Sequence, residues 1–174
     1  MISRIRQFWR NEEGVAAIEV AMLLPVIMIL LLGTIDTGNA IVIHKKVMTA
    51  ASIAADLMAR GSSVDDTEVN DAHTAARMAI DPYNRALLGL DIASVQFVGS
   101  GATPTIMWRE TFNMPPNPNV LTRAAGLGVQ GEGVLVVTTR YVYAPVFSSM
   151  ITDDIVLEEV AVTRGRRSSF VSRE

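Results

Sequence analysis

The chain has 174 residues and a formal net charge of −3 at pH 7. This acidity argues against a nucleic-acid-binding surface, which requires a net basic footprint. Because the sequence contains no cysteine, it has neither a disulfide framework nor a thiolate metal site. Its size fits one domain plus an anchor better than two domains.

The first predicted element is an apolar helix over Val15 to Ile35, in which Glu19 is the only charged residue. At about 1.5 Å per residue, this segment reaches roughly 30 Å, which matches the hydrocarbon core of a bilayer. An ordinary secretory signal peptide has a shorter apolar core and ends in small residues at its cleavage site. The segment therefore predicts a retained membrane-spanning helix rather than a signal peptide that is lost.

The charges on either side of the span predict its orientation. Arg4, Arg6 and Arg10 precede it, whereas the next basic residues after it are Lys45 and Lys46. By the positive-inside rule, the N-terminus is then cytoplasmic and everything after the span is exported.

A glycine and a glutamate mark the start of the span. Gly14 stands immediately before the apolar run, and Glu19 follows five residues later in the stretch EEGVAAIE. This spacing resembles the type IV prepilin processing site, where a membrane peptidase cuts after the glycine. The resemblance implies cleavage between Gly14 and Val15, loss of a cytoplasmic leader, and a mature chain of 174 − 14 = 160 residues. It also implies that Glu19 pairs with the freed α-amine of a neighbouring subunit and sets the axial register of each incoming subunit.

Physical chemistry leaves two interpretations of these residues open. A glycine has no Cβ, so a protease can approach the backbone closely at Gly14. A carboxylate inside an apolar segment costs on the order of 2.5–3.5 kcal/mol, so such a residue usually has a partner or a function. Alternatively, Gly14 is only a loop residue, and Glu19 lies near the cytoplasmic interface, where the helix dipole stabilises it and its side chain reaches water.

A wider stretch, GVAAIEVAMLLPVIMILLLGTIDTGNA, resembles the TadE-like family of the tight-adherence (Tad, or Flp) pilus. Members typically carry an early acidic residue, a proline in mid-helix, and an exit of small residues with an acid and a glycine. The corresponding residues here are Glu19, Pro25, Gly33, Asp36 and Gly38, with Thr37 in place of the usual aromatic residue. Residues 106–109, 133–147 and 160–166 resemble later strands and the ending of the family, although Gly165 stands where members often carry proline.

This resemblance implies a pilin-like subunit or minor pilin that is anchored in the bacterial inner membrane. Its implied partners are a prepilin peptidase, other pilin and minor pilin subunits, and the pilus assembly platform, and no cofactor is expected. Related TadG-type proteins are usually longer, so the length favours a TadE- or TadF-type role.

The helix is predicted to continue beyond the span to about Arg60, with Gly61 as a stop signal. Pro25 is expected to kink it, because proline removes one backbone hydrogen bond and clashes with the preceding turn. Apolar residues recur at steps of three and four in its second half, namely Ala40, Ile43, Val47, Ala50, Ala54 and Leu57. This stripe packs either against neighbouring subunits or on the sheet of its own chain. The predicted division is a leader (1–14), a transmembrane helix (15–38) and a periplasmic or extracellular pilin-like domain (39–174).

The remaining sequence predicts a second helix followed by strands. Ser63-Val64-Asp65-Asp66 is typical of a helix start, and Asp81-Pro82 stops that helix after about Ile80. Four β-rich segments follow, at 92–98, 105–112, 134–143 and 155–163, and the proline-rich stretch 113–119 and the glycine-rich stretch 126–131 are predicted loops. The expected fold is therefore α+β, a long N-terminal helix packed on an antiparallel sheet of about four strands.

No catalytic or metal site is predicted. His44 and His73 lie in different helical segments without metal-ligand spacing, and Glu158 and Glu159 point to opposite faces of a strand. Trp108 and the two strand tyrosines fit a core better than a binding patch. The basic residues from 164 to 167 are interpreted as a solvated chain end.

The sequence leaves three functions open, and enzymatic activity is a fourth, much less favoured alternative. The first is a pilin-like minor subunit that is processed and joins or primes a Tad-type pilus. The second is an uncleaved, single-span assembly factor of the same machinery. The third is a tip adhesin module that recognises a surface through the loop 113–133.

Overall fold

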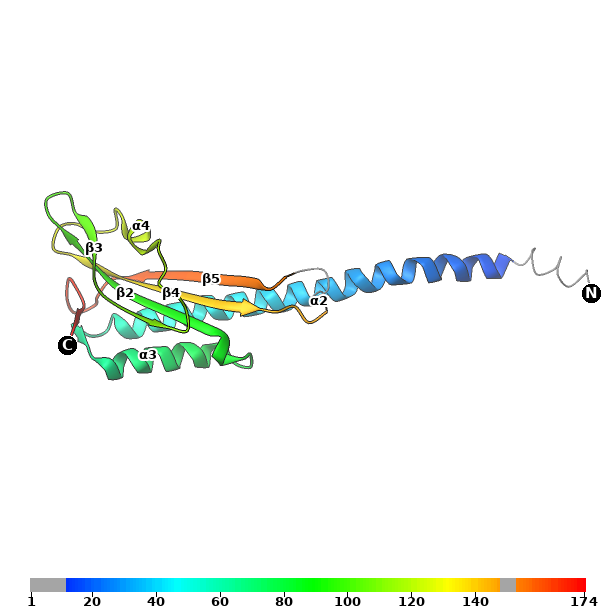
Figure 1. Ribbon diagram of the computed structural model, residues 1–174, viewed down its shortest axis with the longest axis horizontal. Coiled ribbons are helices and arrows are strands. Elements are labelled where there is room, and N and C mark those ends of the chain that lie inside the picture. Colours follow the sequence, from blue (N-terminus) through cyan, green and yellow to red (C-terminus); the bar gives the residue numbers. More distant parts are fainter. Residues whose placement is uncertain (1–11, 148–152) are drawn as a thin grey trace, which may run out of the picture.

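The computed structural model describes residues 12–147 and 153–174. In Figure 1 the N-terminal half of a long helix extends alone from a body formed by the other elements, and the C-terminus lies at the opposite end of the molecule. The helices are α2 (Glu12–Met58), α3 (Asp66–Ala79), the short 3₁₀ helix η1 (Arg85–Leu87) and α4 (Val120–Ala124). The strands are β1 (Ser63–Val64), β2 (Leu88–Val98), β3 (Thr103–Phe112), β4 (Gly133–Tyr143), β5 (Ile155–Thr163) and β6 (Ser172–Arg173).

Helix α2 has 47 residues and differs in burial between its two halves. In the second half, the predicted apolar stripe is buried, and the exposed fractions of Ile43, Val47, Ala50 and Ala54 are at most 1%. These side chains belong to one hydrophobic core with residues of α3 and of the sheet. Of the two interpretations of the stripe, packing on the sheet of its own chain is therefore the correct one.

The end of α2 and the start of α3 differ slightly from the prediction. Helix α2 ends at Met58, before Gly61, and a Cβ at Gly61 would lie 2.5 Å from the carbonyl oxygen of Ser63. The first residues of the predicted helix start form strand β1 instead, and Asp65 is the N-cap of α3. The Asp65 carboxylate accepts from the Glu68 N–H at 2.8 Å, and the Glu68 carboxylate accepts from the Asp65 N–H at 3.1 Å. This reciprocal capping box explains why the helix begins two residues later than Ser63 suggests.

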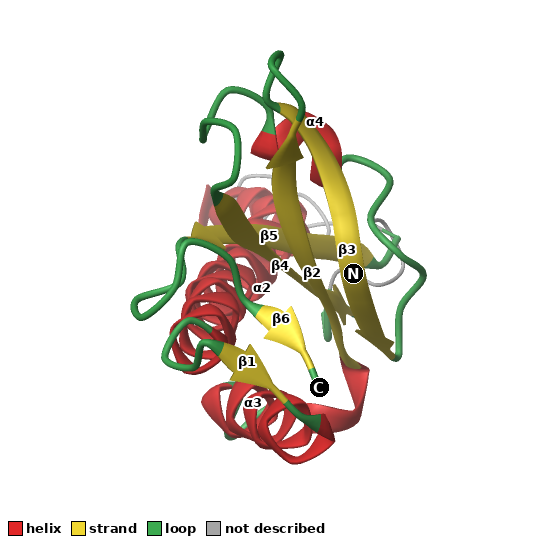
Figure 2. Ribbon diagram, turned by 90° about the vertical axis from the view of Figure 1, so that its left-hand side faces the viewer, coloured by secondary structure: helices red, strands yellow, loops and turns green. Residues whose placement is uncertain are grey.

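The main sheet is antiparallel, has the order β3-β2-β4-β5, and confirms the predicted four strands. Helices α2 and α3 lie together on one of its faces (Figure 2). The opposite face carries a second, smaller core that includes Val95, Phe97, Val120 and Ala124. Residues 120–124 were expected within a loop but form α4, because Val120 and Ala124 are buried one helical turn apart against that face.

A buried polar network fixes the proline-rich loop before α4 to the sheet. Asp91, in the middle of β2, is fully buried and accepts from the Arg109 Nε–H at 2.8 Å and from the Asn117 N–H at 2.9 Å. Arg109 also donates to the Asn117 carbonyl at 2.8 Å, and the Asn117 side-chain amide donates to the Thr138 hydroxyl at 3.0 Å. Burial of these groups is tolerated because each polar group has a partner.

Arg164, Arg166 and Arg167 are exposed, as expected for solvated residues, but the C-terminal segment is also fixed to the body. Strand β6 pairs in parallel with β1. Arg166 forms an ion pair with Asp56 of α2, and its backbone N–H donates to the Ala59 carbonyl at 2.8 Å. Arg173 forms ion pairs with Asp66 and, at 3.1 Å, with Glu110. The arginines of this segment thus hold the chain end against both long helices and β3.

Candidate functional site

The first half of α2 contains the residues predicted for processing and assembly. The most apolar 18-residue stretch of this helix is not buried against any other part of the described chain. The helix is long and apolar enough to cross a membrane. The large apolar side chains between Val15 and Leu31 have exposed fractions of 44–73%. A continuous apolar surface of this size requires a bilayer or neighbouring helices to cover it.

Gly14 and Val15 lie in the first turns of α2, and both are exposed. A Cβ added at Gly14 would meet no atom within 4 Å, so packing inside the chain does not require a glycine there. Glycine disfavours a helix by about 1 kcal/mol relative to alanine. The fold therefore offers no reason for Gly14, and its predicted role in cleavage stays a prediction.

Glu19 is exposed on the same segment, about 7.5 Å along the helix axis from Gly14. Among the ion pairs between described residues, none involves Glu19. Its carboxylate is thus accessible to a group from outside the chain, as the predicted registration role requires. Pro25 lies inside α2, which continues on both sides of it, and the kink stays a prediction.

Asp36 fastens the helix to the sheet at the point where the apolar run ends. It is 4% exposed, although it lies on a helix whose preceding residues are bare. Its carboxylate accepts the Val146 N–H at 3.1 Å and the Phe147 N–H at 2.9 Å. We call this set of contacts the Asp36 clasp. Sequence reasoning placed Asp36 in the family pattern but missed this role. The available signal was an acid directly after the span, and its two partners lie 110 and 111 residues away.

Tyr143, at the end of β4, extends the clasp. It is buried, and its hydroxyl donates to the Asp36 carbonyl at 3.4 Å. Burial raises the pKa of Tyr143, and the nearby negative charge of Asp36 raises it further. The hydroxyl therefore stays protonated at neutral pH and serves as a hydrogen-bond donor.

Two further contacts tie the next turns of α2 to the sheet. The His44 Nε2 atom lies 2.9 Å from a carboxylate oxygen of Glu159 on β5. The buried hydroxyl of Thr139 on β4 donates to the Val47 carbonyl at 3.0 Å. His44 is thus engaged in a helix–sheet contact, and α2 is held to β4 and β5 by polar contacts as well as by the core.

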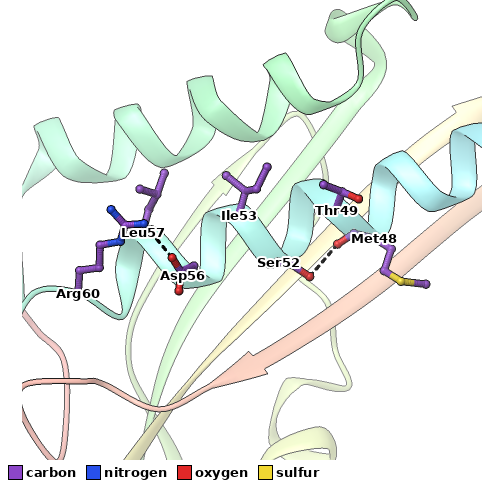
Figure 3. A pocket seen from close by; sticks show the side chains of 7 residues that line it. All are labelled: Met48, Thr49, Ser52, Ile53, Asp56, Leu57 and Arg60. Atoms are coloured by element: carbon purple, nitrogen blue, oxygen red, sulfur yellow. Dashed lines mark hydrogen bonds and ion pairs between the residues drawn. The ribbon is translucent and has the colours of Figure 1, made fainter.

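A shallow groove runs along the outward face of α2 between Met48 and Arg60 (Figure 3). Its polar side chains already have partners within the helix. The Thr49 hydroxyl donates to the Lys45 carbonyl at 2.9 Å, the Ser52 hydroxyl donates to the Met48 carbonyl at 3.0 Å, and Arg60 pairs with Asp56 at 2.9 Å. The groove therefore presents no free set of polar groups for a small ligand.

Tyr141, Trp108 and His73 make contacts within the body of the protein. Tyr141 is buried in the core, and Trp108 donates its indole N–H to the Val171 carbonyl at 2.8 Å. The ring of His73 stacks on Phe112 with centroids 4.1 Å apart. Over residues 12–147 and 153–174, no group of three or more possible metal-ligating side chains gathers.

Comparison with protein families gives a match on the helix just described. Residues 14–56 match the TadE-like protein family. The TadE-like segment includes both the bare half of α2 and most of the half packed on the sheet, and it ends two residues before the helix does. This confirms the resemblance seen in residues 14–40, whereas the resemblance of residues 106–109, 133–147 and 160–166 to later parts of the family stays a prediction.

The TadE-like segment makes up about a quarter of the 174 residues, and the sheet lies outside it. No match was found among curated proteins or among solved structures. The segment contains Gly14, Val15, Glu19, Pro25 and Asp36, so every residue singled out in the first half of α2 belongs to the matched region.

Proposed function

We propose that this protein is a pilin-like minor subunit that assembles into or primes a Tad-type pilus. In this proposal, residues 15–38 anchor it in the inner membrane with a cytoplasmic N-terminus, and residues 39–174 form the periplasmic domain. A prepilin peptidase removes residues 1–14 by cutting between Gly14 and Val15. The proposal rests mainly on the continuous helix α2, which contains the TadE-like segment. Its first part is exposed over a length that can cross a bilayer, and its second part packs on the sheet.

The properties of Gly14 support a role outside the fold. Gly14 and Gly33 both lie in α2, and a Cβ at either would meet no atom within 4 Å. Replacing either by alanine therefore leaves the packing of the chain unchanged and favours the helix by up to about 1 kcal/mol. A peptidase that approaches the backbone at Gly14 would nonetheless distinguish the two substitutions.

Glu19 supports a role in subunit addition. Its carboxylate lies in an apolar segment without an intramolecular ion pair among the described residues, so a positive charge from a neighbour would relieve the cost of burying it. Processing at Gly14 creates an α-amine of this kind on every subunit. The glutamine variant keeps the shape of the side chain and removes its charge, so it tests the ion pair specifically.

The first experiment is intact mass and N-terminal sequencing of membrane-extracted protein from cells with and without their prepilin peptidase. We expect a mature start at Val15 only when the peptidase is present. Gly14→Ala should retain the leader, while the matched control Gly33→Ala should be processed normally. Glu19→Gln should be processed but excluded from pili. A start at Met1 or Ile2 in both strains would refute cleavage and favour the uncleaved assembly factor.

The proposed orientation has its own test, because the chain contains no cysteine. Val129, in the exposed loop after α4, is replaced by cysteine and treated with a membrane-impermeant maleimide. We expect labelling in spheroplasts without lysis. Labelling that requires lysis would place the domain in the cytoplasm and overturn the topology.

The tip adhesin alternative is supported by the position of the loops around α4, in the part of the body remote from the free end of α2 (Figure 1). Leu127 and Val129 are exposed there. Deleting residues 113–133 would not test this alternative cleanly, because Val120 and Ala124 belong to the second core. The variants Leu127→Ser and Val129→Ser keep that core, and the alternative predicts that they form pili but lose attachment.

A further inference from the structure

We infer that residues 144–147, which follow β4, form a second membrane contact that rests in the outer interface of the bilayer and is held there by the Asp36 clasp. This inference depends on the proposed anchoring of α2 in the membrane. Its partner is the lipid surface itself, at the boundary between headgroups and acyl chains.

The depth of this segment follows from its hydrogen bonds. Asp36 is the first charged residue after Glu19, and the apolar run ends directly before it, at Ile35. Both carboxylate oxygens of Asp36 accept backbone N–H groups of this segment, at 3.1 and 2.9 Å. The headgroup layer on each side of a bilayer is roughly 5–7 Å thick. A segment bonded directly to the exit of the span therefore lies within that layer.

The side chains fit this environment. Val146 and Phe147 are 67% and 49% exposed, and Pro145 between them and β4 is buried. The sequence carries no charged residue from position 141 to position 147. Apolar and aromatic side chains at the level of the headgroups are favoured, because part of each ring or branch leaves water. The described part of the body leaves these two side chains uncovered, whereas the interface would cover them.

The shape of the molecule places the segment at the correct end. In Figure 1 the end of β4 and the residues up to 147 lie beside α2, at the side of the body from which the exposed half of that helix emerges. Ile35 is also exposed at this level. The segment and the helix exit thus form one apolar edge that continues the surface of the span.

The test uses single cysteines, because the natural sequence has none. Val146→Cys, Val129→Cys and Leu30→Cys are labelled with an environment-sensitive fluorophore in the full chain and reconstituted into phosphatidylcholine vesicles. The vesicles contain a lipid with a nitroxide quencher near the headgroup end of its acyl chain. Val129 is a matched control, since its exposed fraction of 63% is close to that of Val146. Leu30 reports on anchoring alone.

We expect about threefold stronger quenching at position 146 than at position 129, unaffected by the ratio of protein to lipid. Adding Asp36→Asn should reduce the quenching at position 146 and leave that at position 30 unchanged. If position 30 is quenched but positions 146 and 129 are equally and weakly quenched, the inference is overturned. The membrane anchoring of α2 would still be supported in that case. Absence of quenching at position 30 would instead refute the anchor. Protection of position 146 that grows with protein density would show that a second copy covers the segment, and would also overturn the inference.

Discussion

Replacing Asp91 by alanine tests whether the polar network beneath the proline-rich loop stabilises the fold. Asp91 is fully buried, and its carboxylate receives hydrogen bonds from Arg109 and from the Asn117 backbone. The substitution removes both and leaves the Arg109 guanidinium without its counter-charge, while its side chain remains only 20% exposed. The loss in the free energy of unfolding therefore comes mainly from the Arg109 guanidinium, which stays largely buried without a counter-charge.

Removing one member of a buried ion pair costs about 3–5 kcal/mol. Arg109 is partly exposed and keeps its hydrogen bond to the Asn117 carbonyl at 2.8 Å. We therefore expect the free energy of unfolding to fall by about 3 kcal/mol, the lower end of this range. The double variant Asp91→Ala, Arg109→Ala contains no unpaired charge. Its loss in the free energy of unfolding should be smaller than the summed losses of the two single variants, by about 1 kcal/mol or more.

The assay is urea unfolding of the full chain in mild detergent, in a Trp9→Phe background that leaves Trp108 as the single tryptophan. Trp108 lies on β3 and is hydrogen-bonded to the C-terminal segment, so its fluorescence reports the sheet. The control is the Asp81–Arg85 pair, whose side chains are 47% and 45% exposed. Its alanine variants should leave the urea midpoint unchanged, because exposed pairs are screened by water. Strictly additive losses at Asp91 and Arg109, or a midpoint shift no larger than in the control, would refute the reasoning.

Three further outcomes follow from the packing and the charges. Gly89→Ala should lower the free energy of unfolding by about 1–3 kcal/mol, because its Cβ would lie 2.7 Å from the Cβ of Met114; an unchanged urea midpoint would contradict this. Thr139→Val should cost about 1 kcal/mol through loss of the hydrogen bond to the Val47 carbonyl, measured in the same way. Burial lowers the pKa of His73, so the unfolded chain takes up this proton at a higher pH than the folded chain does. The free energy of unfolding should therefore fall as the pH drops below 6.5, the ordinary pKa of histidine. The free energy of unfolding of the His73→Gln variant should fall less over the same range, and equal slopes in the two proteins would contradict the shift.

The long helix and the four strands could be predicted because their signals are local. The apolar run from Val15 to Ile35 and the stripe through Ile43 and Val47 repeat with the helical period, and strand segments such as 134–143 are rich in β-branched and aromatic residues. The predicted bounds differ from the structure by a few residues, as at Asp65, because capping depends on which side chain reaches the backbone. Periodicity does not contain that information.

The contacts that organise the site could not be predicted in this way. Asp36 and Val146 are 110 residues apart in the sequence. Asp91 lies on β2, and its partner Asn117 lies in the loop between β3 and α4. A carboxylate next to a membrane span has the same local sequence whether it caps a distant loop or faces water. The same holds for Arg166, whose partner Asp56 lies on the helix near the other end of the chain. Such pairings are decided by tertiary packing, which a single sequence does not display.

The continuity of α2 has a mechanical consequence. The exposed segment of this helix ends at Asp36, and about two turns later, at Ile43, the same helix forms part of the hydrophobic core. Tension applied to its N-terminal end is therefore transmitted to the body without an intervening linker. That tension acts nearly parallel to β4 and β5 (Figure 1) and loads the Asp36, His44 and Thr139 contacts together in shear. Contacts loaded in parallel share the force, whereas contacts peeled in sequence break one at a time. The body is therefore built to travel with its helix as one piece when that helix is pulled along its axis.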